Sequence, residues 1–146
     1  MTANAWDGSQ GLDAELRTTR EAGKGRRVTG AVLTTLTTLF LLFDAVGKVM
    51  LPSQVTDAFA RLGIPISQGM TIAVMLFVST IFYAIPRTSI FGAILLTGYL
   101  GGAVAIHLRA GSTVFEMIFP ILFGIVAWAG IYLRECRLTQ ILPLRR

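Results

Sequence analysis

The sequence has few charged residues, one cysteine and one histidine, and each shortage excludes a class of protein. Charged residues make up 14% of its 146 residues, whereas soluble domains carry about 25%. The single Cys136 excludes an internal disulfide. There is no motif for a c-type haem, an iron–sulfur centre or a thiolate metal site. We therefore expect no metal ion, and no cofactor is evident from motifs.

The charges that are present gather at the two ends of the chain. Residues 1–27 and 134–146 carry 14 of the 21 charged residues, and the 106 residues between them carry seven. A domain of this size leaves much of its surface exposed, so a soluble core could not hide the apolar remainder. This excludes an ordinary soluble enzyme and a nucleic-acid-binding domain. It predicts an integral membrane protein whose surroundings are the lipid bilayer.

Four apolar segments of about 20 residues each fill the middle of the chain. That length crosses about 30 Å of hydrocarbon at roughly 1.5 Å per residue. Helices satisfy the backbone of such continuous runs within lipid. We expect an all-α fold, a transmembrane four-helix bundle, with helices over about residues 28–51, 66–85, 88–108 and 114–133.

The segments outside these helices have their own signals. Residues 1–27 lack a sustained apolar period, which predicts a disordered basic tail, and residues 134–146 form a second basic tail. Pro86 with Arg87 predicts a tight turn between the second and third helices. Apolar residues at helical spacing within residues 52–65 predict a short amphipathic helix at the membrane surface.

The basic residues predict the orientation of the chain. With the N-terminus inside, ten Lys and Arg residues lie on the inner side and three on the outer side. Such a bias is typical of cytoplasmic segments. We expect a multi-pass protein of the inner (plasma) membrane, N-in and C-in, with both termini cytoplasmic.

In this topology, polar side chains from all four helices share the outer end of the bundle. They are Asp44, Lys48, Gln68, His107 and Glu116. The inner halves of the helices carry no equivalent set. The sequence therefore predicts a polar pocket near the outer leaflet, to which Tyr99 of the third helix also points.

Asp44 and Lys48 are four residues apart, so they share one helix face and can pair. Burial at that depth is costly, which leaves open either a self-neutralising pair or a functional one. His107 beside Arg109 is either a solvated helix end or a site residue.

Glu116 stands four residues before Pro120, which predicts a kink beside the carboxylate and a carbonyl freed from its helical bond. Gly98 and Gly102 form a G-x-x-x-G pair. That pattern favours close helix packing, with room for a flat ligand as the alternative.

Four stretches carry a resemblance to a known family: DAVGK at residues 44–48, RLGIP at 61–65, IPRTSI at 85–90 and LLTGYLGGAVAIHLR at 95–109. Over about residues 29–133 the chain resembles the DoxX-like membrane proteins. The resemblance implies a compact four-helix membrane bundle. Relatives in the wider group resemble a subunit of a thiosulfate–quinone oxidoreductase, or work in membrane complexes linked to redox defence. Others are assembly factors or small-molecule binders.

Three functions stay open at this point. The first is an accessory or quinone-facing component of a membrane redox system, with quinone as cofactor and a membrane redox protein as partner. The second is a small membrane-embedded enzyme, an isomerase or hydrolase acting on a lipophilic small molecule. The third is a structural or assembly factor. Candidate catalytic residues are Asp44, Glu116 and His107; candidate substrate- or cofactor-binding residues are Lys48, Gln68 and Tyr99. A homo-oligomer is left open.

Overall fold

The computed structural model describes residues 4–134, with side chains from residue 23 onward. The elements are α1 (Asn4–Met50), α2 (Ser53–Leu62), the short 3-10 helix η1 (Ile66–Gln68), α3 (Gly69–Ala84), α4 (Ser89–Arg109) and α5 (Val114–Arg134). The described part of the chain contains no strand. The second basic tail beyond Arg134, with Cys136, lies outside the described residues.

Four of the helices are long and apolar enough to cross a membrane. The spans are Gly23–Met50, Ile66–Ala84, Ser89–Arg109 and Val114–Arg134. They confirm the four predicted helices and the all-α class. The predicted short helix in the longest connection is also confirmed as α2, whose Phe59 is buried. Which end of the bundle faces the cytoplasm stays a prediction.

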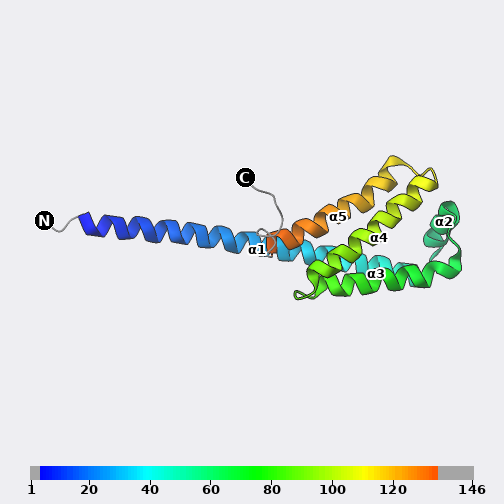
Figure 1. The fold of residues 1–146 in the computed structure, drawn as a ribbon, viewed down its shortest axis with the longest axis horizontal. Helices are drawn as coiled ribbons and strands as arrows, with labels where there is room; N and C mark the ends of the chain where they lie inside the picture. The colour runs from blue at the N-terminus through cyan, green and yellow to red at the C-terminus, as the bar shows by residue number, and fades with distance from the viewer. Residues whose placement is uncertain (1–3, 135–146) are drawn as a thin grey trace.

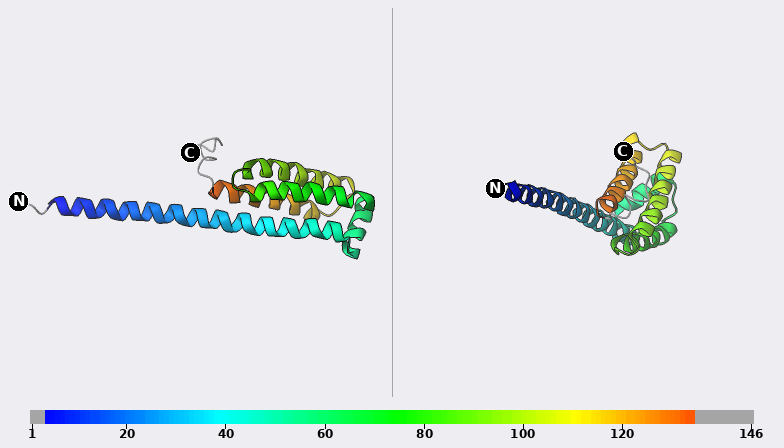
Figure 2. Two further views of the ribbon diagram at one scale, coloured as in Figure 1. Left: turned by 90° about the horizontal axis from the view of Figure 1, so that it is seen from below. Right: turned by 60° about the vertical axis from the view of Figure 1, so that its left-hand side comes forward.

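The N-terminal segment differs from its prediction as a disordered tail. In the structure α1 begins at Asn4 and runs without interruption into the first span. Its first part projects well beyond the bundle (Figures 1 and 2). Apolar residues at helical spacing show which face of a helix is buried, and a helix without a buried face lacks them. Residues 4–27 contain no proline, and a helix nucleated by the membrane span extends without a new nucleation cost.

The four long helices form a ring in which each packs against two others. α1 lies against α3 and α5, and α4 closes the ring on the opposite side. Figure 1 shows that the α1–α3 pair and the α4–α5 pair approach each other at the α3–α4 turn and diverge toward α2. We call the first end, which carries Arg26, Arg87 and Arg134, the basic end, and the other the α2 end.

The core is a column of apolar side chains along the inside of the ring. Its members are Leu41, Ala45, Leu76, Tyr83, Ala93, Leu96, Ala127 and Ile131. Large apolar side chains cover the outside instead, among them Phe43 and Phe115, each at least three-quarters exposed. Since a bilayer solvates such a surface, this inside-out distribution agrees with a membrane-spanning bundle.

Two close backbone approaches hold the ring at its basic end. A Cβ atom on Gly92 of α4 would lie 2.1 Å from the Tyr83 nitrogen of α3. A Cβ atom on Gly30 of α1 would lie 2.8 Å from the Gly130 oxygen of α5. These pairs of helices therefore pack with almost nothing between their backbones.

The predicted close packing at Gly98 and Gly102 was wrong within this chain. A Cβ atom at either position would meet nothing within 4 Å. The G-x-x-x-G spacing marks one face of α4, but the helices beside α4 contact other faces of it. The spacing alone does not say which face a neighbour occupies.

Candidate functional site

Asp44 and Lys48 form an ion pair on the last turns of α1. Lys48 Nζ lies 2.5 Å from Asp44 Oδ1, as their spacing predicted. The lysine side chain is 17% exposed and the aspartate side chain 38% exposed. Both groups are thus partly removed from solvent, and each lies beside a group of opposite charge, the arrangement that such residues adopt in a membrane span.

Tyr99 is the third residue predicted for this site and lies halfway along α4 (Ser89–Arg109). Its ring packs against the core column. Among the described residues, no group forms a hydrogen bond with the Tyr99 hydroxyl. The bundle therefore presents a phenol with unused hydrogen-bonding capacity at mid-height, and an ammonium and a carboxylate nearer its α2 end.

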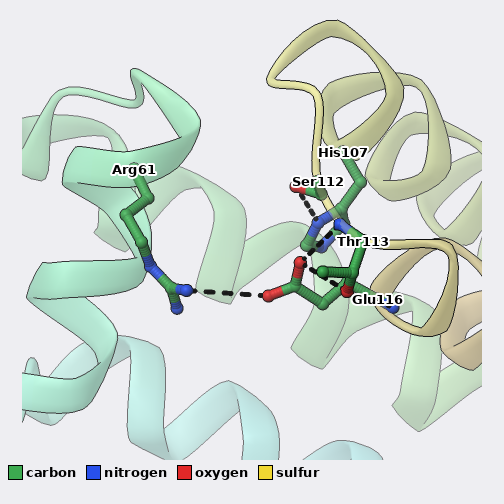
Figure 3. Close-up of polar contacts among 5 residues, drawn as sticks. All are labelled: Arg61, His107, Ser112, Thr113 and Glu116. Atoms are coloured by element: carbon green, nitrogen blue, oxygen red, sulfur yellow. Dashed lines mark hydrogen bonds and ion pairs between the residues drawn. The ribbon is translucent and has the colours of Figure 1, made fainter.

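Glu116 caps the start of α5 (Figure 3). Its Oε2 accepts hydrogen bonds from the Thr113 backbone nitrogen and from Thr113 Oγ1, both at 3.0 Å. The Glu116 nitrogen in turn donates to Thr113 Oγ1 at 3.5 Å. This is a capping box, which satisfies backbone donors that a helix start leaves free. The Thr-x-x-Glu signature stands in the sequence, and our sequence reasoning missed it.

The other side of Glu116 faces α2. Arg61 Nη1 lies 3.7 Å from Glu116 Oε1, across the gap drawn in Figure 3. Because the Arg61 side chain is 71% exposed, solvent screens the pair and it stabilises the structure little. Arg109 forms a second polar contact with α2: its Nη2 donates a hydrogen bond to the Leu62 carbonyl at 3.4 Å.

His107 and Gln68 occupy separate places at this end. His107 Nδ1 lies 3.0 Å from Ser112 Oγ, within the α4–α5 connection. Gln68 is exposed and lines an open depression of about 490 Å³ with Pro65, Ile106 and Arg109, among others. Neither residue touches the Asp44–Lys48 pair through an interaction that the structure shows.

The predicted site residues other than Tyr99 therefore share one end of the bundle but fall into three groups. Asp44 and Lys48 form the first, while Tyr99 lies toward the middle of α4. Glu116 joins Arg61, with His107 at the end of α4 nearby (Figure 3), and Gln68 shares its depression with Arg109. Among the described residues, no hydrogen bond or ion pair connects Asp44 to Glu116. No three His, Cys, Asp or Glu side chains there are grouped to hold a metal ion.

The other halves of the helices also bury polar side chains, although of a different kind from the set at the α2 end. The buried polar residues in those halves are Thr34, Thr37, Ser79, Thr80, Tyr83 and Ser89. Most bond to nearby carbonyls, such as Tyr83 Oη to Ala127 O at 3.0 Å. Thr37 Oγ1 and Arg134 Nε and Nη2 are buried without a partner in the described structure. The set predicted from the sequence at the α2 end consists of ionisable and amide side chains, and hydroxyl groups were not part of that prediction.

Fold and surface together define a multi-pass integral membrane protein with a polar end. Residues 32–130 match the model of the DoxX-like family, which covers more than half of the chain. The chain belongs to the DoxX-like family, and this confirms the resemblance seen in the sequence. Comparison with curated proteins and with solved structures finds no match.

Proposed function

We propose that this DoxX-like protein binds a lipophilic molecule of the quinone class at its α2 end, as an accessory component of a membrane redox system. The observation that carries the proposal is the Tyr99 hydroxyl. It has no hydrogen-bond partner among the described residues, its ring packs against the core column, and the Asp44–Lys48 pair lies nearer the α2 end on α1. A polar group left unpaired within a membrane bundle is costly and marks a candidate binding site.

The chemistry of the three groups suits a quinone head. Quinone carbonyls accept hydrogen bonds, and both the Tyr99 hydroxyl and the Lys48 ammonium donate them. Asp44 holds the ammonium in place, at 2.5 Å from Oδ1. The isoprenoid tail of such a molecule would stay in the hydrocarbon, where the outer surface of the bundle is apolar.

The enzymatic alternative receives less support from the geometry. A general acid or base must reach the proton that it transfers. Here Lys48 engages Asp44, while Thr113 and Arg61 engage Glu116. The acid–base roles of Asp44, Glu116 and His107 stay predictions, and the contacts of Glu116 favour a structural role for that residue.

The cellular setting belongs to the same proposal. The excess of basic residues, ten against three, supports an inner-membrane location with the basic end in the cytoplasm. The proposed head-group site then faces the outer leaflet. A cysteine-accessibility assay with single cysteines placed near Arg87 and near Arg61 tests this, because a membrane-impermeant reagent should label only the second.

The binding test compares two variants that differ only in which hydroxyl is removed. The purified protein in lipid nanodiscs is titrated with a short-tailed quinone analogue. Tyr99→Phe should weaken binding by about tenfold, the loss of one hydrogen bond worth about 1.4 kcal/mol. Tyr132→Phe makes the same chemical change near the basic end and should leave the affinity unchanged.

Two results would contradict the proposal. One is a wild-type protein that binds no quinone analogue at saturating concentration. The other is Tyr99→Phe binding as tightly as the wild type, which would place any quinone elsewhere. The accessory role is tested separately by affinity purification from native membranes, in which a redox enzyme should co-purify.

A further inference from the structure

A groove between α4 and α5 runs along the outside of the bundle, away from the site described above. It has a volume of about 580 Å³, and its lining includes Gly101, Val104, Pro120, Gly124, Trp128 and Tyr132. Two of these residues lack a side chain, which is why the surface is hollow. A Cβ atom on Gly101 would meet nothing within 4 Å, and one on Gly124 would meet only Leu100 Cδ1, at 3.7 Å.

Polar side-chain atoms in the wall of the groove form hydrogen bonds within the protein. Trp128 Nε1 donates to Thr97 Oγ1 at 2.9 Å, and Thr97 Oγ1 donates to the Ala93 carbonyl at 2.8 Å. These bonds fix the indole ring and leave it as an apolar wall. A groove of this kind within a membrane span accepts hydrocarbon rather than water.

A positively charged side chain, Arg26, lies at one end of the groove. Tyr132 lines the groove, and the Arg26 guanidinium carbon lies 5.4 Å from the centre of its ring. Arg26 Nη2 also donates to the Tyr132 carbonyl at 3.1 Å, which holds the arginine of α1 against the end of α5. Arg26 is exposed, and a guanidinium has further N–H groups that can bind a phosphate.

We propose that this groove binds one acyl chain of an anionic phospholipid whose phosphate contacts Arg26. The apolar groove suits an acyl chain. The positive charge of Arg26, which lies at the basic end of the bundle, suits the anionic head group. Anionic lipids are attracted to basic residues at a membrane surface. The groove is not lined by Asp44, Lys48 or Tyr99, so the failure of either binding proposal leaves the other one unaffected.

Trp128 provides a direct probe of the groove. The chain has two tryptophans, so Trp6→Phe leaves Trp128 as the sole emitter. The full chain is reconstituted in phosphatidylcholine bilayers containing a small fraction of lipid with brominated acyl chains, which quench tryptophan on contact. Brominated phosphatidylglycerol should reach half-maximal quenching at about fivefold lower fraction than brominated phosphatidylcholine, from about 1 kcal/mol per basic residue.

Two matched substitutions on α4 test the location. Gly101→Leu fills the groove, and Gly98→Leu adds the same side chain to another face of α4; a Cβ atom fits at both positions. Gly101→Leu should abolish the preference for phosphatidylglycerol, whereas Gly98→Leu should keep it. Arg26→Gln should reduce the preference to near one while leaving quenching by either lipid intact.

Three results would overturn the inference. Equal quenching by the two brominated lipids would mean that Trp128 meets bulk lipid only. A retained preference in Gly101→Leu would place the anionic lipid elsewhere. Displacement of brominated phosphatidylglycerol by a small amount of long-tailed quinone would assign the groove to a quinone tail instead.

Discussion

Replacing Gly92 by alanine is expected to disrupt the contact between α3 and α4. The added Cβ atom would lie 2.1 Å from the Tyr83 nitrogen, 2.4 Å from Tyr83 Cα and 2.5 Å from the Phe82 carbonyl carbon. All three are backbone atoms, so no side-chain rotation can relieve the overlap, and the helices must separate. Overpacking of a well-packed core costs about 1–3 kcal/mol. We expect a loss of stability at the upper end of that range, about 3 kcal/mol.

Gly98→Ala on the same helix is the matched control. Its Cβ atom would meet nothing within 4 Å, and alanine is a better helix former than glycine by up to about 1 kcal/mol. We expect this variant to be as stable as the wild type or slightly more stable. Reversible unfolding in mixed micelles by added sodium dodecyl sulfate, followed by circular dichroism, compares the three proteins.

An equal loss of stability in Gly98→Ala and Gly92→Ala at low protein concentration would contradict this expectation. That result would mean that the G-x-x-x-G face packs within the chain after all, as its spacing predicted. A Gly92→Ala variant with wild-type stability would equally show that α3 and α4 do not approach as closely as the structure has them.

Three further predictions use the same unfolding measurement. Thr113→Ala should lower the free energy of unfolding by about 1 kcal/mol by opening the cap of α5, and Glu116→Ala should lower it as well. The double variant should lose less than the sum of the two; full additivity would argue against a shared capping box. Tyr83→Phe should cost about 1 kcal/mol through its lost bond to the Ala127 carbonyl, and an unchanged midpoint would contradict that bond. Thr37→Val should be neutral or stabilising because the Thr37 hydroxyl is buried without a partner; a clear loss of stability would reveal a partner.

The helices were predictable because the bilayer imposes their length. The fourth predicted helix, residues 114–133, differs from α5 (Val114–Arg134) by one residue at its end. The helical start at Asn4 was not predictable from apolar periodicity, because that part of α1 lies beyond the bundle (Figure 2). Helix propensity and the nucleated span act there without leaving an apolar pattern.

The sequence predicted how far along the helices the candidate residues lie, but it did not predict which residues they contact. Counting residues along antiparallel helices placed Asp44, Gln68, His107 and Glu116 at one end, and the structure has them there. The count says nothing of which side of each helix faces a neighbour. The capping box of Glu116 was readable from local spacing alone, since its partner is three residues away.

The two ends of the bundle are held by different kinds of contact, and this bears on where a ligand can reach the interior. At the basic end, backbone meets backbone at Gly92 and at Gly30, and separating those helices would expose unfilled space along their whole contact. At the α2 end, α2 is held by the burial of Phe59, by the exposed Arg61–Glu116 pair at 3.7 Å and by the bond from Arg109 to the Leu62 carbonyl at 3.4 Å. Solvent screens such exposed polar contacts, so they stabilise the structure little. Because backbone packing as close as that at Gly92 and Gly30 is the stronger restraint, the helices separate more easily at the α2 end, and a ligand enters more easily there.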